Sequence, residues 1–312
     1  MTTRPFRRPP FAALPQRPPR PHDFLALPER SVRVRVAGER LRVAYRERGE
    51  GPPLLLVHGL MTSGYSWRHV MAPLSALGFR VLAPDLPGAG GSEAPVKPCT
   101  ADRLTEAIGA FQDALGIAGC AAVGNSMGGY LCMRLALREP ERFPRLVNVH
   151  SPAVPLLRLR ALRAALASPV ARALVRAAVA RDPERWVFRN VHYYDESLKS
   201  REELEVYAAP LKTPKGRRAF VSWLRDGLDP GELARFMDEL VELRRAQRPF
   251  PTPLLLLYAR EDPMVPPSVG CALGRLLPDA EQVWLARSSH FAHVDTPELF
   301  VDAVTPFLRA EG

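Results

Sequence analysis

The stretch GNSMGG (residues 124–129) decides the fold. It follows the apolar run CAAVG (120–124) and precedes a segment with helical character, so a buried strand turns into a helix here. A G-x-S-x-G pattern in that place is typical of a strained turn that lifts a serine hydroxyl above the end of a sheet. Side chains at Gly124 and Gly128 would collide with such a turn, which explains the two glycines. Ser126 is therefore the predicted nucleophile.

Outward from this turn, strands and helices alternate. The predicted strands cover residues 32–37, 41–45, 54–58, 80–85, 120–124, 146–150, 254–258 and 282–286. The predicted helices cover residues 66–77, 102–115, 127–138, 267–277 and 297–309. The first two strands read as a hairpin, and the later continuous apolar runs are typical of parallel strands buried on both faces. The pattern predicts an α/β fold with a mostly parallel sheet and helices on both faces. Its core would comprise residues 31–151 and 251–312.

Residues 152–250 interrupt this alternation, because they are helical and rich in arginine and alanine. An insertion at the carboxyl edge of an α/β sheet lies over the place where ligands bind. We therefore expect an inserted helical cap, with a helical bulge of no function as the alternative. Four aromatic residues of this segment are candidates to line an acyl or aromatic pocket, although they would serve equally as its core. They are Trp186, Tyr193, Tyr194 and Trp223.

Residues 1–30 are rich in proline and arginine and contain little that would form a core, which predicts a disordered arm. No stretch is apolar for long enough to cross a membrane, and prolines interrupt the region where a signal peptide would need its apolar segment. The four cysteines have no metal-binding or disulfide spacing, so we expect free thiols in a cytoplasmic protein.

The composition, 46% hydrophobic and 24% charged over 312 residues, excludes a wholly disordered or fibrous chain. The net charge of +10 is spread along the chain without a recognisable nucleic-acid motif, so no nucleic-acid partner is expected. The sequence leaves the oligomeric state open.

A serine hydroxyl needs a base to remove its proton. Of seven histidines, His290 follows the last predicted strand, in the loop SSHFAH, from which it reaches toward Ser126. We expect the nearby His293 to be a structural, hydrogen-bonded residue. Asp262 follows the preceding strand at the same edge and is the predicted partner of the base, with Glu261 as its rival.

The reaction also needs two N–H donors for the negatively charged oxygen. The backbone N–H of Met127 faces the reacting carbonyl at the start of a helix. Leu60 follows the strand 54–58, and its N–H is the second predicted donor. His58 beside it is expected to brace the loop. No metal or organic cofactor is implied.

Five motifs in this order resemble the α/β-hydrolase superfamily. They are HGLMTSGYSW (58–67), DLPGAGGS (85–92), GNSMGG (124–129), YAREDPMVP (258–266) and SSHFAHVDTPE (288–298). The resemblance implies a triad of Ser126, Asp262 and His290, with Leu60 and Met127 forming the oxyanion hole. Ser289 stands where the family often has glycine.

The substrate class remains open within that resemblance. Haloalkane dehalogenases and epoxide hydrolases of the superfamily use an aspartate nucleophile, which Ser126 does not match. GNSMGG resembles the carbon–carbon bond hydrolases of meta-cleavage pathways, but HGLM lacks their glycine- and proline-rich oxyanion loop.

We expect a serine hydrolase that cleaves a carboxylic ester or related small acyl compound through an acyl-enzyme. The alternatives are a meta-cleavage carbon–carbon hydrolase, a cofactor-free perhydrolase, or a non-catalytic hydrolase-like protein that binds a ligand.

Overall fold

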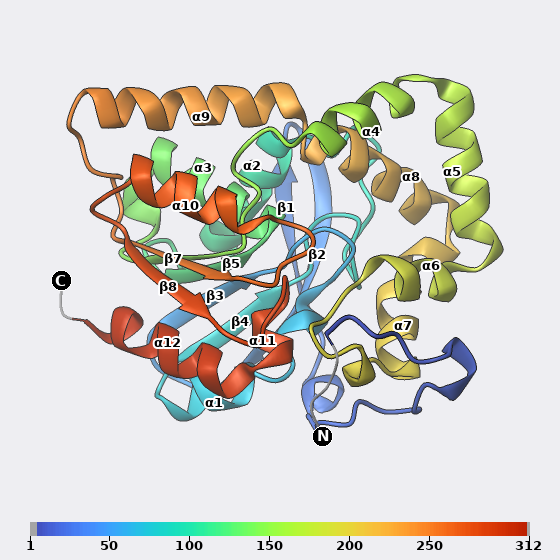
Figure 1. Cartoon of the computed structure of the whole chain (residues 1–312). Helices are drawn as coiled ribbons and strands as arrows, with labels where there is room; N and C mark the ends of the chain where they lie inside the picture. The colour runs from blue at the N-terminus through green and yellow to red at the C-terminus, as the bar shows by residue number, and fades with distance from the viewer. Residues whose placement is uncertain (1–4, 311–312) are drawn as a thin grey trace.

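The computed structural model describes residues 5–310 and contains one eight-stranded sheet (Figure 1). The strand order is β1-β2-β4-β3-β5-β6-β7-β8. The strands are β1 (Arg30–Val36), β2 (Glu39–Arg48), β3 (Pro53–Val57), β4 (Arg80–Pro84), β5 (Ala121–Asn125), β6 (Leu146–Val149), β7 (Leu254–Ala259) and β8 (Glu281–Leu285). The predicted hairpin is β1–β2, and β2 also pairs antiparallel with β4. All later pairs are parallel, as the sequence predicts.

Helices cover both faces of this sheet, which explains the continuous apolar strands. Leu55 and Val57 of β3 pack on one side with α2 (Ala101–Leu115), α3 (Met127–Arg138) and α10 (Pro267–Leu276). Leu54 and Leu56 pack on the other side with α1 (Met71–Ala76) and α12 (Pro297–Arg309). Because side chains alternate along a strand, one apolar run supplies two separate cores.

The helix expected at 66–77 is broken into a short 3₁₀ turn, Gly64–Trp67, and α1. Pro73 explains the break, because proline lacks an N–H and fits only the first turn of a helix. The turn leaves Trp67 fully buried.

A helical insertion, residues 152–229, leaves the sheet after β6. Its helices are α4 (Leu157–Ala167), α5 (Pro169–Arg181), α6 (Pro183–Asn190), α7 (Arg201–Ala208) and α8 (Pro214–Ser222). They lie together beyond the carboxyl ends of the parallel strands (Figure 1).

The next helix, α9 (Pro230–Arg245), runs back over the sheet alongside α3 and α10 (Figure 1). Phe236 of α9 packs edge-on against Tyr130 of α3, with their ring centroids 5.2 Å apart. This helix therefore covers the sheet, although the expected cap extended to residue 250.

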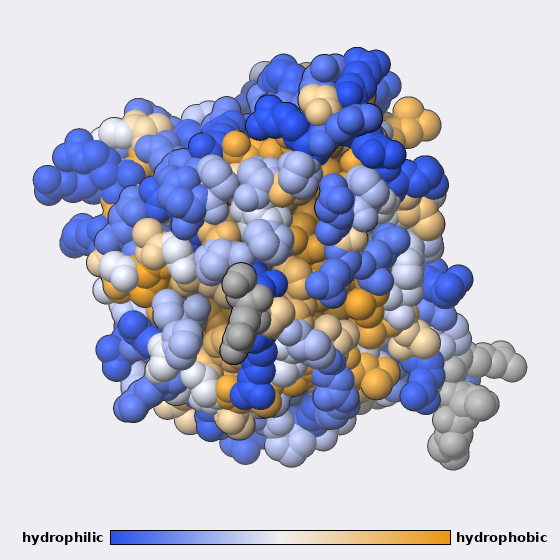
Figure 2. Space-filling view, turned by 90° about the vertical axis from the view of Figure 1, so that its left-hand side faces the viewer, coloured by the Kyte–Doolittle hydropathy of each residue, from blue (hydrophilic) through white to orange (hydrophobic). Residues whose placement is uncertain are grey.

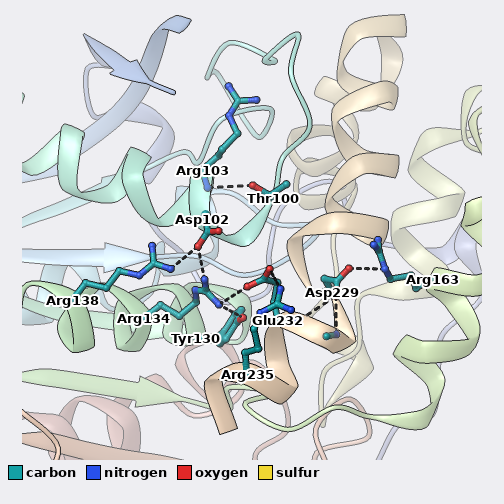
Figure 3. Close-up of polar contacts among 11 residues, drawn as sticks. Thr100, Asp102, Arg103, Tyr130, Arg134, Arg138, Arg163, Asp229, Glu232 and Arg235 are labelled. Atoms are coloured by element: carbon teal, nitrogen blue, oxygen red, sulfur yellow. Dashed lines mark hydrogen bonds and ion pairs between the residues drawn. The ribbon is translucent and has the colours of Figure 1, made fainter. Parts of the chain in front are cut away.

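A group of ion pairs joins α9 to the helices beneath it (Figure 3). Arg134 of α3 pairs with Asp102 of α2 and with Glu232 of α9. Beside them, Arg163 of α4 pairs with Asp229, the residue that caps the start of α9. These contacts fix where the chain leaves and rejoins the sheet layer.

The described part of the arm, residues 5–29, packs against the body, which differs from the disorder expected from its prolines. Leu14 and Phe24 are buried, and the Phe11 ring meets Phe188 of α6 with centroids 5.3 Å apart. His22 contacts the Tyr65 hydroxyl at 3.1 Å. A few well-placed apolar side chains hold the segment, and residues 1–4 lie outside the described part.

The side of the molecule that carries the C-terminus shows hydrophilic residues interspersed with hydrophobic ones (Figure 2). No helix within residues 5–310 has the length and apolar character that a bilayer crossing requires.

Candidate active site

The turn between β5 and α3 has the strained backbone that its glycines predict. Ser126 has φ 55° and ψ −121°, a conformation rare for a non-glycine residue. A Cβ at Gly124 would lie 2.6 Å from the Cα of Gly129, and one at Gly128 would lie 2.4 Å from the carbonyl oxygen of Val57. Both distances are far below van der Waals contact, so only glycine fits there.

His290 and Asp262 meet at the carboxyl edge of the sheet, as the sequence predicts. Nδ1 of His290 lies 2.8 Å from Oδ2 of Asp262 in a hydrogen bond. Oδ1 of Asp262 accepts hydrogen bonds from the backbone N–H groups of Met264, at 2.6 Å, and Val265, at 2.9 Å. The carboxylate is thus held from both sides before it orients the imidazole.

These contacts keep Asp262 ionised. Burial by itself would raise the pKa of Asp262, but attraction to His290 and the contacts with His150 and His290 outweigh burial and lower it. A carboxylate only accepts hydrogen bonds, so the proton of neutral His290 sits on Nδ1. Nε2 is then free to accept a proton.

His150 is a second histidine at Asp262, which the sequence reasoning missed. It follows β6, is fully buried, and places Nδ1 2.9 Å from the same Oδ2 that His290 contacts. Burial lowers the pKa of His150, so it is neutral. Its backbone has φ 53°, a left-handed conformation. The signal for His150 in the sequence is its position at the end of the predicted strand 146–150, at the same sheet edge as Asp262.

Asn125 links the serine turn to the base. Its side-chain amide donates to the carbonyl oxygen of His290 at 3.0 Å. A residue inside the turn therefore helps to fix the backbone of the histidine loop relative to Ser126.

The rival residues lie apart from this arrangement. Glu261 makes no hydrogen bond or ion pair with a described residue, and its Oε2 is buried. His293 is buried and stacks on Trp67 with ring centroids 4.1 Å apart. Neither of its ring nitrogens has a hydrogen-bond partner within residues 5–310, so the expected hydrogen bonding is wrong. Burial holds the pKa of His293 well below its ordinary value.

His58 braces the loop that carries Leu60. Its Nε2 accepts a hydrogen bond from the N–H of Leu86 at 2.9 Å, and its Nδ1 lies 2.8 Å from the carbonyl oxygen of Gly59. Burial lowers the pKa of His58 to about 4. Leu60 itself lines a cavity together with Ser126, and Met127 is the first residue of α3.

That cavity has a volume of about 240 Å³ and contains both Ser126 and His290 in its wall. The insertion supplies much of the apolar wall, including Leu156, Leu159, Leu162, Val191, Leu224 and Leu228. Two polar residues of the insertion, Arg158 and Asn190, complete it.

None of the four aromatic residues suggested for the pocket lines this cavity. Tyr193 is buried and donates its hydroxyl hydrogen to Glu203 at 2.8 Å. The Trp223 indole donates to the carbonyl oxygen of Pro87 at 3.1 Å. The polar atoms of Tyr193 and Trp223 thus have partners outside the cavity, so these two rings serve as packing. Phe291, which lies outside the insertion, contributes an aromatic ring to the cavity wall.

His150, Asp262 and His290 form the one group of possible metal ligands found within the described residues, with donor atoms within 4.8 Å of one another. The two oxygens of Asp262 already accept three hydrogen bonds, and Nδ1 of His150 lies 2.9 Å from Oδ2 without hydrogen-bond geometry. That arrangement suits a histidine pair that shares a carboxylate.

Comparison with known proteins agrees with this geometry. The family model of the α/β-hydrolase fold matches residues 52–297. A 2-hydroxymuconate semialdehyde hydrolase of Pseudomonas putida is 30% identical over 290 residues, which cover 90% of this chain and 95% of the relative. A 2-hydroxy-6-oxononadienedioate/2-hydroxy-6-oxononatrienedioate hydrolase of Burkholderia vietnamiensis is 29% identical over 89% of this chain and 94% of its own length.

Among solved structures, a meta-cleavage product hydrolase from Pseudomonas fluorescens IP01 is similar with a TM-score of 0.65 and 25% identity. The match covers 91% of this chain and 98% of that one. The sheet order, the serine turn and these matches lead to one conclusion: the chain belongs to the α/β-hydrolase fold family.

Proposed function

We propose that this hydrolase uses Ser126, His290 and Asp262 as a catalytic triad to cleave a carboxylic ester or related acyl compound. The observation that carries the proposal is the 2.8 Å contact between His290 and Asp262, in a cavity whose wall also contains Ser126. A nucleophile, a base and an ionised carboxylate at one site are the parts that acyl transfer requires.

In the proposed reaction, Nε2 of His290 removes the hydroxyl proton of Ser126 as the oxygen attacks the substrate carbonyl carbon. Asp262 stabilises the imidazolium that forms. The backbone N–H groups of Leu60 and Met127 stabilise the oxyanion. His290 then protonates the leaving alkoxide, and an acyl-enzyme remains. A water molecule, deprotonated by His290, releases the acid and restores Ser126.

The cavity favours a substrate with an apolar acyl group. Its wall is mostly leucine, valine and methionine, and a volume of about 240 Å³ suits a small compound. We propose that the insertion acts as a cap, since α4 contributes Leu159 and Leu162 to this wall and thereby shields the reacting atoms from water.

A carbon–carbon bond hydrolase of the meta-cleavage type is the second candidate. The two full-length relatives carry such names, and Arg158 in the cavity wall offers a cation for a substrate carboxylate. Against this candidate, the segment after β3 reads HGLM and lacks the glycine- and proline-rich loop. Epoxide hydrolase chemistry is disfavoured because Ser126 replaces the aspartate nucleophile.

Two measurements test these proposals. A fluorophosphonate probe should label the protein at Ser126 and fail to label Ser126→Ala, whereas a protein that only binds ligands would not react. Turnover of esters with graded acyl chains, compared with turnover of an aromatic meta-cleavage product, then decides between the substrate classes. Preference for the meta-cleavage product by orders of magnitude in kcat/KM would overturn the ester proposal.

The assignment of the base has a matched control within the chain. His290→Ala should remove almost all turnover. His293→Ala should keep the parent's kcat per folded molecule, because His293 contacts neither Asp262 nor the cavity. The opposite result would assign the base to His293.

A further inference from the structure

The first half of the insertion is cationic without compensating acids. Residues 151–181 contain six arginines and neither aspartate nor glutamate. Of these six, Arg163 alone forms ion pairs within residues 5–310, with Asp226 and Asp229. Arg158 and Arg172 donate to backbone carbonyl oxygens, and Arg160, Arg176 and Arg181 have neither kind of contact with a described residue. Elsewhere some arginines are paired, as Arg134 is with Asp102 and Glu232, and others, such as Arg244 and Arg248, form no ion pair within residues 5–310. The distinguishing feature of residues 151–181 is that they contain no acidic residue of their own. The positive charge of α4 and α5 is therefore available to a partner.

The outer face of α5 is also apolar. Its exposed positions are Pro169, Val170, Ala173, Leu174, Ala177, Ala178, Ala180 and Arg181, and most of them repeat at the spacing of one helix face. Val170 is 67% exposed and Leu174 is 65% exposed. Six large hydrophobic side chains are exposed within the described residues, and three belong to α4 and α5, the third being Leu157 at 81%. We call this surface of α4 and α5 the α4–α5 face.

We propose that the α4–α5 face docks on an anionic lipid bilayer surface. An apolar helix face flanked by arginines is the pattern of a helix that lies in the headgroup region and inserts its apolar side chains shallowly. Negatively charged headgroups complement the unpaired arginines, each of which contributes about 1 kcal/mol near such a surface, a factor of roughly five in affinity.

The geometry favours lipid over two other occupants. A nucleic acid would neutralise the arginines but would leave Val170 and Leu174 in water, since its surface is charged phosphate. A second copy of this chain would bury the apolar side chains but would bring the two sets of arginines together, and like charges repel. A bilayer with anionic headgroups satisfies both features.

Docking here would bring the membrane next to the reacting groups. Leu156, Leu159 and Leu162, on or beside α4, line the cavity that contains Ser126. Arg172 joins the two helices rigidly, because its guanidinium donates to the carbonyl oxygens of Leu166 and Ala167 at 2.8 Å. The docking proposal does not depend on the chemistry at Ser126, so the two are tested separately.

The test is co-sedimentation of the full-length Ser126→Ala protein with phosphatidylcholine vesicles, with and without phosphatidylglycerol. Ser126→Ala keeps the vesicles intact if the enzyme hydrolyses lipids. We expect binding to the anionic vesicles, little binding to phosphatidylcholine alone, and release at high salt.

Two double variants remove the separate features of the face. Val170→Ser with Leu174→Ser removes the apolar contacts, and Arg160→Gln with Arg181→Gln removes two exposed charges. The charge variant should bind at least about tenfold more weakly. All four side chains lie largely at the surface, so the thermal midpoint should stay near that of the parent. Arg172 is left in place because it joins the helices.

The matched control is Arg244→Gln with Arg248→Gln, which removes two exposed arginines, one in the last turn of α9 and one just after it. This end of α9 lies far from α4 and α5 (Figure 1). This control should bind vesicles like the parent. The proposal is overturned if the parent ignores anionic vesicles at low salt, or if both face variants still bind like the parent. Two other outcomes, each without vesicle binding, would also refute the proposal. One is self-association of the protein that Leu174→Ser abolishes. The other is binding of nucleic acid that is unchanged by substitution of Val170 and Leu174.

Discussion

Replacement of His150 tests whether the second histidine at Asp262 tunes the reaction. His150→Phe keeps a ring of similar size and removes the nitrogen that lies 2.9 Å from Oδ2. His150→Asn also removes the imidazole. The backbone at this position is left-handed, with φ 53°, a conformation that asparagine tolerates and in which phenylalanine is strained. An effect common to both variants therefore comes from the lost contact and not from backbone strain.

The expected size follows from the contacts of the carboxylate. A hydrogen bond to a charged group contributes about 1.5–3 kcal/mol, which is an upper limit for the contact of His150 with Oδ2, because neither ring nitrogen of His150 has a hydrogen-bond partner within residues 5–310. Without His150, Asp262 keeps its two backbone donors and His290. Oδ2 then has one partner instead of two, so it interacts more strongly with protonated His290. With about half of that upper limit transferred, at 1.36 kcal/mol per pH unit, the acid limb of the kcat/KM profile moves by at most roughly 0.5–1 unit.

The sign is toward higher pH. Asp262 that has lost its contact with His150 stabilises the imidazolium form of the base more strongly, so the acid limb of the kcat/KM profile moves upward in both variants. The assay is kcat/KM for the preferred ester across the range where histidine titrates, with His293→Phe as the control. An acid limb that stays at the parent's position in both variants, or moves to lower pH, would show that His150 has no electrostatic influence on the site.

Three further expectations concern the triad and the arm. Ser126→Ala and His290→Ala should each abolish nearly all turnover, and the double variant should be hardly worse, because the triad acts as a unit. Asp262→Asn should lower kcat by orders of magnitude while Glu261→Gln stays close to the parent; the reverse ranking would assign the carboxylate to Glu261. Deletion of residues 1–29 should lower the thermal midpoint by several degrees, because buried apolar side chains in that segment contribute about 1.5–3 kcal/mol each. An unchanged midpoint would show that the segment adds no stability.

The parts of the fold that sequence predicts well are those set by local requirements. The turn at Ser126 needs glycine at 124 and 128 because backbone atoms approach within 3 Å of where a Cβ would be. The sheet follows from apolar runs that are long enough for strands and separated by helices. Asp262 and His290 could be placed together because parallel strands end at one edge. Their catalytic roles remain predictions until the variants are measured.

The misses depend on contacts between distant segments. Tyr193 was a pocket candidate, but the sequence cannot show that its hydroxyl finds Glu203 inside the insertion. His150 lies 112 positions before Asp262, and only the pairing of β6 with β7 brings the two together. The prolines of the arm predict disorder, whereas the structure buries two of its apolar side chains, Leu14 and Phe24, against the body.

The ion pair between Arg163 and Asp229 has a consequence for how this family of proteins diversifies. It joins a helix near the start of the insertion to the residue at its end, so the chain departs from the sheet and returns at nearly the same place. The entropy of closing a loop between two neighbouring points grows only slowly with the length of the loop. Evolution or a designer can therefore exchange residues 152–229 for a shorter or longer segment at small thermodynamic cost. The strained serine and its partners stay on the rigid sheet, while the exchangeable segment supplies much of the cavity wall beside them.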